Sequence, residues 1–184
     1  RSASIPVEEE RGATRYTWAR MVDYAIEQEM DLVLLTGDIV DQDNKFYEAV
    51  GPLQTGFKAL EQAGISVYMV AGNHDYDVLA QIDAVNSFEN VYVLGKNGQW
   101  ESKIFTKGEE SVRLWGWSFP GRYVESEVIS SFPGQSGEDA VPSLALLHGD
   151  LYQPVSRYHP VNIDILQPTA HVDAWLLGHI HKTD

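Results

Sequence analysis

Residues 31–41, DLVLLTGDIVD, contain the stretch that decides the fold class of this chain. A short apolar run ends at Gly37 and gives way to the carboxylates of Asp38 and Asp41. An apolar run of this length, closed by glycine, is typical of a strand buried on both faces of a parallel sheet. The stretch therefore predicts an α/β protein with acidic side chains directly beyond a strand.

The same arrangement recurs three more times along the chain. Apolar runs lead into GNHD at residues 72–75, HGD at residues 148–150 and GHIH at residues 178–181. In open α/β sheets, ligands bind beyond the carboxyl ends of the strands. We therefore expect all four strand ends to bring Asp, Asn or His side chains to one rim.

Helical periodicity fills the space between the first strands. Apolar residues recur at helical spacing over residues 14–29 and 46–63, although Pro52 predicts a late start or a kink in the second helix. We also expect a loop over residues 1–13, a hairpin over 99–117 and helices over 78–88 and 122–130. This β-α-β alternation predicts parallel strands with helical crossovers.

Composition limits the class of function. The chain has 184 residues, 13 basic and 27 acidic, for a net charge of −14, and it has no cysteine. This charge argues against a broad basic surface for nucleic acid or anionic membrane, and the lack of cysteine excludes thiolate ligands and nucleophiles. No apolar run is long enough to span a membrane, so we expect a cytoplasmic protein without membrane contact.

Four of the six histidines lie at the strand ends: His74, His148, His179 and His181. Taken alone, Asp38 reads as a helix cap and Asn73 as a turn residue. Together, these oxygen and imidazole donors predict a site for Mn, Fe, Zn or Mg, because no sulfur ligand is present. The other two histidines, His159 and His171, are assigned to surface or helix-end positions.

A site with a bridging carboxylate holds two metals about 3.5–4 Å apart, and such a pair suits phosphoryl chemistry. His74 directly follows Asn73, so it is expected beside the metals, where an imidazole protonates a leaving oxygen or stabilises phosphoryl charge. Asp75 is grouped with His74 in the catalytic set. Asp75 or Asp41 is expected to orient neighbouring imidazoles.

The ordered set GDxxD, GNHD, a strand-end His and GHxH resembles the calcineurin-like metallophosphoesterases over the whole chain. Within that superfamily, it is most similar to the SbcD-like nuclease subunits of DNA double-strand-break-repair exonucleases. The finer likeness rests on Arg11 and Arg15 before the first helix, AGISVYMVAGNHD at residues 63–75, Tyr158-His-Pro160, and DIL at residues 164–166 leading to WLLGHIHK at 175–182.

The resemblance implies a fold and a set of roles. The fold is a four-layer αββα sandwich, here without its first strand. Asp38 bridges two divalent ions, Mn foremost, and Asn73, His148 and His179 complete the second site. His181 serves the first site, His74 is the catalytic histidine that is not a ligand, and Asp41 and Asp75 support the ligands.

One departure concerns the Asp-x-His motif with which the family begins, because no such motif precedes Asp38. We expect it to lie upstream of Arg1, so residues 1–184 are interpreted as a single domain truncated at both ends.

The expected activity is two-metal hydrolysis of phosphodiester bonds by a DNA-repair exonuclease-like enzyme. One alternative is a phosphodiesterase or phosphatase for nucleotides or other small phosphoesters, and another is a non-catalytic metal-binding scaffold. The resemblance implies an ATPase partner, and a homodimer stays open. Arg122, Arg157 and Tyr158 are weaker candidates for phosphate or substrate contacts.

Overall fold

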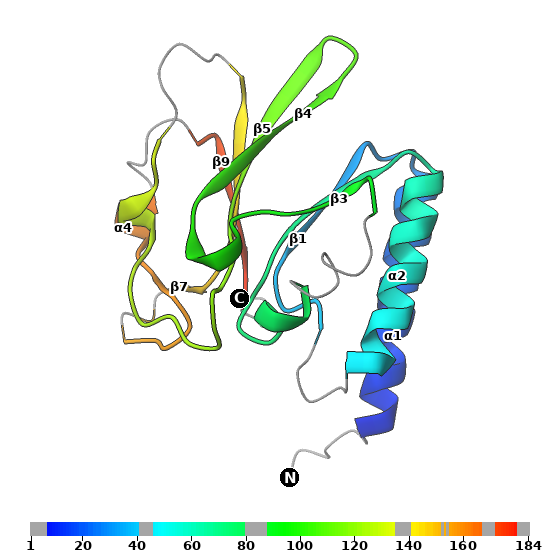
Figure 1. The fold of residues 1–184 in the computed structure, drawn as a ribbon, viewed down its shortest axis with the longest axis horizontal. Helices are drawn as coiled ribbons and strands as arrows, with labels where there is room; N and C mark the ends of the chain where they lie inside the picture. Colours follow the sequence, from blue (N-terminus) through cyan, green and yellow to red (C-terminus); the bar gives the residue numbers. More distant parts are fainter. Residues whose placement is uncertain are drawn as a thin grey trace.

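A computed structural model describes residues 7–40, 46–79, 88–134, 141–151, 153, 155–166 and 172–179. Two sheets lie at the centre of the molecule, and two long helices lie outside the first of them (Figure 1). No helix in these described ranges has the length and apolarity needed to cross a membrane.

The first sheet has three parallel strands in the order β1-β2-β3: β1 (Leu32–Thr36), β2 (Ser66–Val70) and β3 (Val91–Val93). Helix α2 (Phe46–Gln62) connects β1 to β2 and passes through Pro52 without ending. The expected crossover is confirmed, and the predicted late start of the helix is wrong. The carbonyl of Pro52 accepts a hydrogen bond from Trp18 Nε1 at 3.0 Å, which joins α2 to the first helix.

Helix α1 (Val7–Glu27) begins earlier than the sequence pattern indicated. Residues 7–13 were expected to form a loop, yet their backbone is helical. The reason is intrinsic propensity, because the run Glu8–Glu10 consists of strong helix formers and contains no breaker. A polar stretch can therefore form the first turns of a helix.

Alternation along β2 divides the apolar side chains between two cores. Val67 and Met69 face α1 and α2, where they pack with Phe57 and Leu60. Tyr68 and Val70 face the opposite way and pack against the second sheet. Because side chains alternate along a strand, the apolar residues 67–70 are covered on both faces of the sheet, as the sequence predicted.

The second sheet has the order β4-β5-β6-β9. Its strands are β4 (Glu101–Lys107), β5 (Glu110–Trp117), β6 (Ser143–His148) and β9 (Ala174–Gly178). β4 and β5 form the predicted antiparallel hairpin, whose turn contains Gly108 at a φ of 62°. β5, β6 and β9 run parallel to one another.

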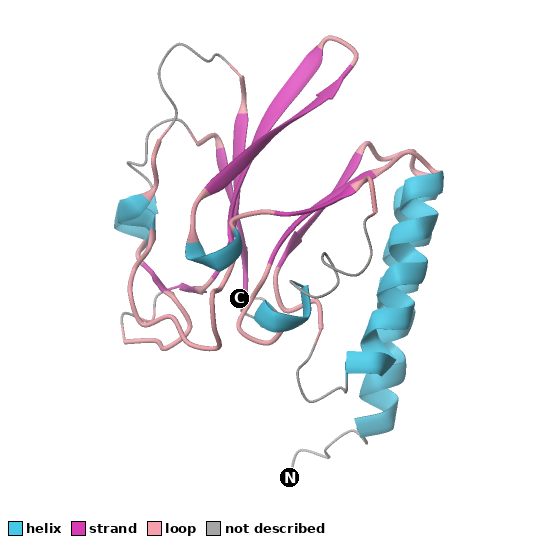
Figure 2. Cartoon of the chain, in the orientation of Figure 1, coloured by secondary structure: helices cyan, strands magenta, loops and turns pink. Residues whose placement is uncertain are grey.

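A third core lies on the outer face of the second sheet. Trp117 and Leu147 pack there against Phe119 and Ile129 from the segment 118–134 and against Leu166 of α4 (Ile163–Leu166). Figure 2 shows this layer as loop with short helices. The sandwich therefore has four layers, with long helices on one side and short elements on the other.

The helix predicted over residues 122–130 is wrong. The structure has only the 3-10 turn η2 (Ile129–Ser131), and Val124 forms an isolated parallel bridge with Tyr158. Val124 and Val128 stand four residues apart, as in a helix, and both are buried, but the backbone at Val124 is engaged by another segment. Backbone pairing with residues 157–159 therefore takes the place of a helix. The short strands β7 (Asp150–Leu151) and β8 (Pro160–Val161) continue this pairing.

The helix predicted over 78–88 lies mostly outside the described residues.

Candidate metal centre

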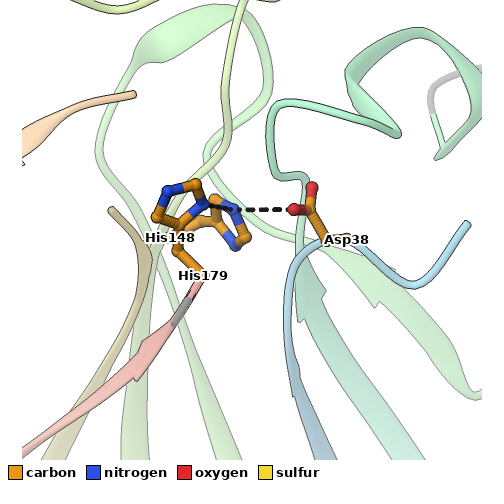
Figure 3. Close-up of side chains that lie close together, drawn as sticks. All are labelled: Asp38, His148 and His179. Atoms are coloured by element: carbon orange, nitrogen blue, oxygen red, sulfur yellow. Dashed lines mark hydrogen bonds and ion pairs between the residues drawn. The ribbon is translucent and has the colours of Figure 1, made fainter. Parts of the chain in front are cut away.

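The ends of four parallel strands meet at one rim, as the sequence predicted. Asp38 follows β1 and Asn73 follows β2 in the first sheet, while His148 ends β6 and His179 follows β9 in the second. Figure 3 shows the carboxylate of Asp38 opposite the imidazoles of His148 and His179. One potential ligand atom from each of these three side chains lies within 4.8 Å of the others. The site therefore lies at the junction of the two sheets.

Nε2 of His148 is the centre of this group. It lies 3.2 Å from Asp38 Oδ2, 3.1 Å from Asn73 Oδ1 and 3.2 Å from His179 Nδ1. The His148 side chain is fully buried and that of Asp38 is 13% exposed, so solvent supplies little compensation. The four atoms therefore depend on one another, or on a bound ion, for their electrostatic balance.

The opposite nitrogen of the ring indicates what His148 offers to this group. His148 Nδ1 lies 2.8 Å from the backbone oxygen of Thr36, which only accepts hydrogen bonds, so Nδ1 carries a hydrogen. In the neutral imidazole, Nε2 then presents a lone pair to the oxygens of Asp38 and Asn73. One proton on Nε2 satisfies these acceptors incompletely, whereas a cation satisfies all of them. This donor set fits a divalent metal, and the Thr36 carbonyl orients the ring for it.

The ligand chemistry limits the metal. Carboxylate, amide oxygen and imidazole suit Mn, Fe, Zn or Mg. His181 and Asp41, predicted as a ligand and as a supporting residue, lie outside the described residues.

Burial raises the pKa of Asp38, but the contact with His148 and the backbone N–H of His74 outweigh it. The net result is a pKa below the ordinary value. Asp38 is therefore an anion at neutral pH, as a metal ligand must be.

Two of the candidate ligands have unusual backbone conformations. Asp38 has a φ of 52° and His179 a φ of 120°, both in the region that favours glycine. Such conformations cost of order 1–3 kcal/mol each and tend to gather at functional sites. The surrounding fold thus holds both side chains at the rim against a local preference for other conformations.

Two glycines make room for the ligands. A Cβ at Gly37, whose φ is 89°, would lie 2.6 Å from His148 Nδ1. A Cβ at Gly72 would collide with Asp38 Oδ1 and lie 2.9 Å from His148 Cε1. Both positions therefore need glycine for the close approach of the two sheets, in addition to any need of the turn.

Asp75 holds the two loops of the first sheet together. Its buried carboxylate accepts hydrogen bonds from the backbone N–H of Gly72 and of Ile39, both at 2.7 Å. Burial raises the pKa of Asp75 to about 6, against the effect of these two donors. This geometry fits the supporting role that the sequence analysis gave Asp75, because the carboxylate positions the loops of Asp38 and Asn73.

His74 contacts Asp38 through its backbone, and its imidazole is a separate candidate for catalysis. Its N–H donates to Asp38 Oδ1 at 2.9 Å, and its side chain is half-buried. The imidazole is not part of the described group of ligand atoms that gather within 4.8 Å. This placement agrees with a histidine beside the metal centre that is not one of its ligands.

His159 was assigned to a surface or helix-end position, and that assignment is wrong because the residue directly precedes β8. The residue is fully buried, with Nδ1 3.0 Å from the backbone oxygen of His148 and Nε2 3.4 Å from the N–H of Val128. Burial lowers the pKa of His159, so the ring is neutral at physiological pH. The sequence carries no local signal for this role. His159 is buried because residues 158–161 pair with distant segments, and local periodicity does not report such pairing.

Of the three weaker candidates, only Tyr158 contacts a candidate ligand among the residues that the structure describes. The ring of Tyr158 lies 5.4 Å from that of His179, measured between centroids. Arg122 and Arg157 are exposed, and each lies over the ring of Tyr123, which the sequence analysis did not single out.

Comparisons with known proteins agree with this geometry. Residues 12–183 match the family model described as "Calcineurin-like phosphoesterase". The "Uncharacterized metallophosphoesterase YhaO" of Bacillus subtilis is 30% identical over 164 residues, covering 88% of this chain and 39% of that protein. This chain therefore spans well under half the length of that relative.

A crystal structure with 12% sequence identity superposes with a TM-score of 0.53, covering 90% of this chain and 79% of the other. This likeness supports the fold alone. The family match covers nearly the whole chain and includes every described strand end with a candidate ligand. The chain belongs to the calcineurin-like phosphoesterase family.

Proposed function

We propose that this chain is the catalytic domain of a divalent-metal-dependent phosphodiesterase, with a DNA-repair exonuclease as its first candidate identity. The observation that carries the proposal is the convergence of Asp38 Oδ2, Asn73 Oδ1 and His179 Nδ1 on His148 Nε2. We propose two ions, Mn foremost, with Asp38 as a ligand of both. His181 is proposed as a further ligand of the first.

Asp38, Asn73, His148 and His179 would hold the metal. A bound divalent cation supplies Lewis acidity and attracts phosphoryl oxygens. The residues themselves form an anionic and imidazole rim whose positions are held by the Thr36 carbonyl and by Asp75. Held in place in this way, the residues would keep a bound cation where negative charge develops on the phosphoryl oxygens.

His74 is proposed as the proton donor. Hydrolysis forms a bond between water oxygen and phosphorus and breaks the bond from phosphorus to the leaving oxygen, which takes a proton. An imidazole beside the ligands is suited to supply that proton near neutral pH. The backbone hydrogen bond to Asp38 fixes the distance of His74 from the centre.

The choice of DNA rests on the resemblance of residues 63–75 and 175–182 to repair exonucleases. A net charge of −14 favours a small footprint on DNA, because duplex binding is dominated by phosphate neutralisation. Nucleotides and other small phosphoesters are therefore the second candidate substrates. An ATPase subunit is proposed as partner on the same resemblance.

The test offers the full-length protein end-labelled duplex DNA and a small chromogenic phosphodiester, with Mn²⁺ or with a chelator. Metal-dependent cleavage of both supports the nuclease, and cleavage of the small diester alone reassigns the substrate. Metal binding without turnover of either substrate contradicts the proposal and supports a scaffold.

Asp38→Asn should lose turnover and metal in parallel, since it removes a charged ligand. Asp23→Asn, at an exposed position of α1, is the matched control and should retain both.

A further inference from the structure

Aromatic and cationic side chains extend outward from the metal centre in a row. The ring of Tyr158 lies beside His179 at 5.4 Å, and the ring of Tyr123 lies 5.9 Å from that of Tyr158. Cζ of Arg157 lies 4.0 Å from the centroid of the Tyr123 ring, and Cζ of Arg122 lies 5.7 Å from it. We name this row, Tyr158, Tyr123, Arg157 and Arg122, the tyrosine–arginine shelf.

Backbone pairing holds the shelf in place. The N–H of Val124 donates to the carbonyl of Arg157 at 2.9 Å, and the N–H of His159 donates to the carbonyl of Val124 at 2.6 Å. Val124 and His159 are buried, whereas Tyr123 is 44% exposed. Buried residues thus anchor both segments of the shelf, while Tyr123 and the two arginines are exposed.

We propose that the tyrosine–arginine shelf binds the nucleoside part of a phosphodiester substrate, with the base against Tyr123 and a neighbouring phosphate at Arg157. This inference rests on the proposed function and specifies its substrate class. Flat aromatic faces and arginine planes bind unpaired bases by stacking, and arginine also pairs with phosphate oxygens. The position of Tyr158 against His179 makes the row continuous with the site of hydrolysis.

The carboxylate that pairs with Arg157 can be replaced by a substrate phosphate. Nε of Arg157 lies 3.4 Å from Oε1 of Glu125, and both side chains are mostly exposed. An exposed ion pair of this kind is weak, so a phosphate dianion or diester can displace the carboxylate. Glu125 therefore acts as a competitor for the guanidinium that a substrate would engage.

The kinetic test compares two esters with the same leaving group. The full-length protein with Mn²⁺ hydrolyses thymidine 5′-(p-nitrophenyl phosphate) and its counterpart that has 2-deoxyribose without the base. Stacking of one base predicts a kcat/KM ratio of about tenfold in favour of thymidine. Tyr123→Leu should reduce that ratio towards one.

Charge variants change the affinity in opposite directions. Arg157→Gln should raise KM for the thymidine ester severalfold, and Glu125→Gln should lower it, because it frees the guanidinium. A purely structural role of the ion pair predicts the same direction for both, and that result would overturn the proposal. Tyr16→Leu is the matched control, since Tyr16 is 68% exposed and stacks on Arg20 in helix α1.

A binding measurement separates the shelf from catalysis. Thymidine 5′-monophosphate and deoxyribose 5-phosphate are titrated into chelator-treated full-length protein, followed by calorimetry. Tighter binding of the nucleotide that Tyr123→Leu abolishes supports the shelf, even if neither ester is hydrolysed and the proposed function fails. Equal binding of both, with hydrolysis intact, overturns the shelf and leaves the function standing.

Two further substrates show whether the base that the shelf binds belongs to a small nucleotide or to a nucleic acid strand. A thymidine dinucleotide and a single-stranded thymidine oligonucleotide are compared in the same assay. Preference for either one, lost in Tyr123→Leu, supports the shelf and assigns free nucleotides or nucleic acid as its ligand. Insensitivity of both to this variant overturns it.

Discussion

Nδ1 of the buried His159 lies 3.0 Å from the backbone carbonyl oxygen of His148, the residue at the centre of the candidate metal site. On its other side, Nε2 of His159 accepts from the N–H of Val128 at 3.4 Å. The neutral ring with hydrogen on Nδ1 satisfies both contacts. His159 therefore connects the metal centre to the segment 118–134, which covers the outer face of the second sheet.

Replacement of His159 by leucine should destabilise the fold and weaken metal binding. The change leaves the carbonyl of His148 and the N–H of Val128 unpaired in the interior, which costs about 1–3 kcal/mol. His159→Asn should cost less, because asparagine tolerates the φ of 57° at this position. Urea denaturation and metal titration of the two variants provide the check, and equal losses in both would contradict the bridging role of the ring.

Stability should decline below neutral pH in part because of His159. Burial lowers the pKa of His159 in the folded state, so the unfolded chain binds the proton more readily. The stabilisation is therefore present above about pH 6.5, the ordinary histidine value, and is lost as pH falls towards the lowered pKa. Denaturation of chelator-treated wild type and His159→Asn from pH 8 to 5 should give a shallower decline for the variant. Parallel curves would rule out this contribution.

Asp75→Asn should disturb the metal centre without removing a ligand. An amide has one accepting oxygen, so either Gly72 or Ile39 loses its hydrogen bond and meets an NH₂ donor instead. We expect a loss of about 1–3 kcal/mol in stability and weaker metal binding. Asp77→Asn, exposed two residues later, is the control. Full metal affinity in Asp75→Asn would show that the two loops hold their positions without this carboxylate.

Gly72→Ala should lower metal affinity sharply, because the new methyl group would displace Asp38 and His148. Gly51→Ala, within helix α2, has no atom within 4 Å of the added Cβ and should stabilise the protein by about 0.5–1 kcal/mol. Thermal melting and metal titration of the pair are measured together. A Gly72→Ala protein that binds metal as the wild type does would refute the steric argument.

His74→Ala should remove most turnover and leave metal content nearly unchanged, since its imidazole lies outside the described ligand group. Metal analysis alongside steady-state kinetics distinguishes the two effects. Loss of metal together with activity would make His74 a ligand.

The sequence predicted the parts of the site that follow strands. Asp38, Asn73 and His148 each come directly after or at the end of an apolar run, and parallel strands bring such positions to one rim. The two long helices were predicted from their apolar residues, whose helical spacing indicates the buried face. The early start of α1 was missed because residues 7–13 carry no apolar pattern of helical spacing.

Contacts made by backbone atoms could not be predicted in this way. The Thr36 carbonyl that orients His148 and the two N–H groups held by Asp75 carry no residue-type signal. Tyr123 was missed because its neighbours in space, Tyr158 and Arg157, lie more than thirty positions later in the chain. Pairing between distant segments determines such sites, and local periodicity does not report it.

The candidate ligands are divided between the two sheets, with Asp38 and Asn73 on the first and His148 and His179 on the second. An ion bound by all four side chains would hold the two sheets together. Its binding free energy then adds to the free energy of folding, so the melting temperature becomes a function of metal concentration. Conversely, a substitution in the apolar layer between the sheets that shifts one sheet against the other would change the affinity for the metal, although it lies far from the rim.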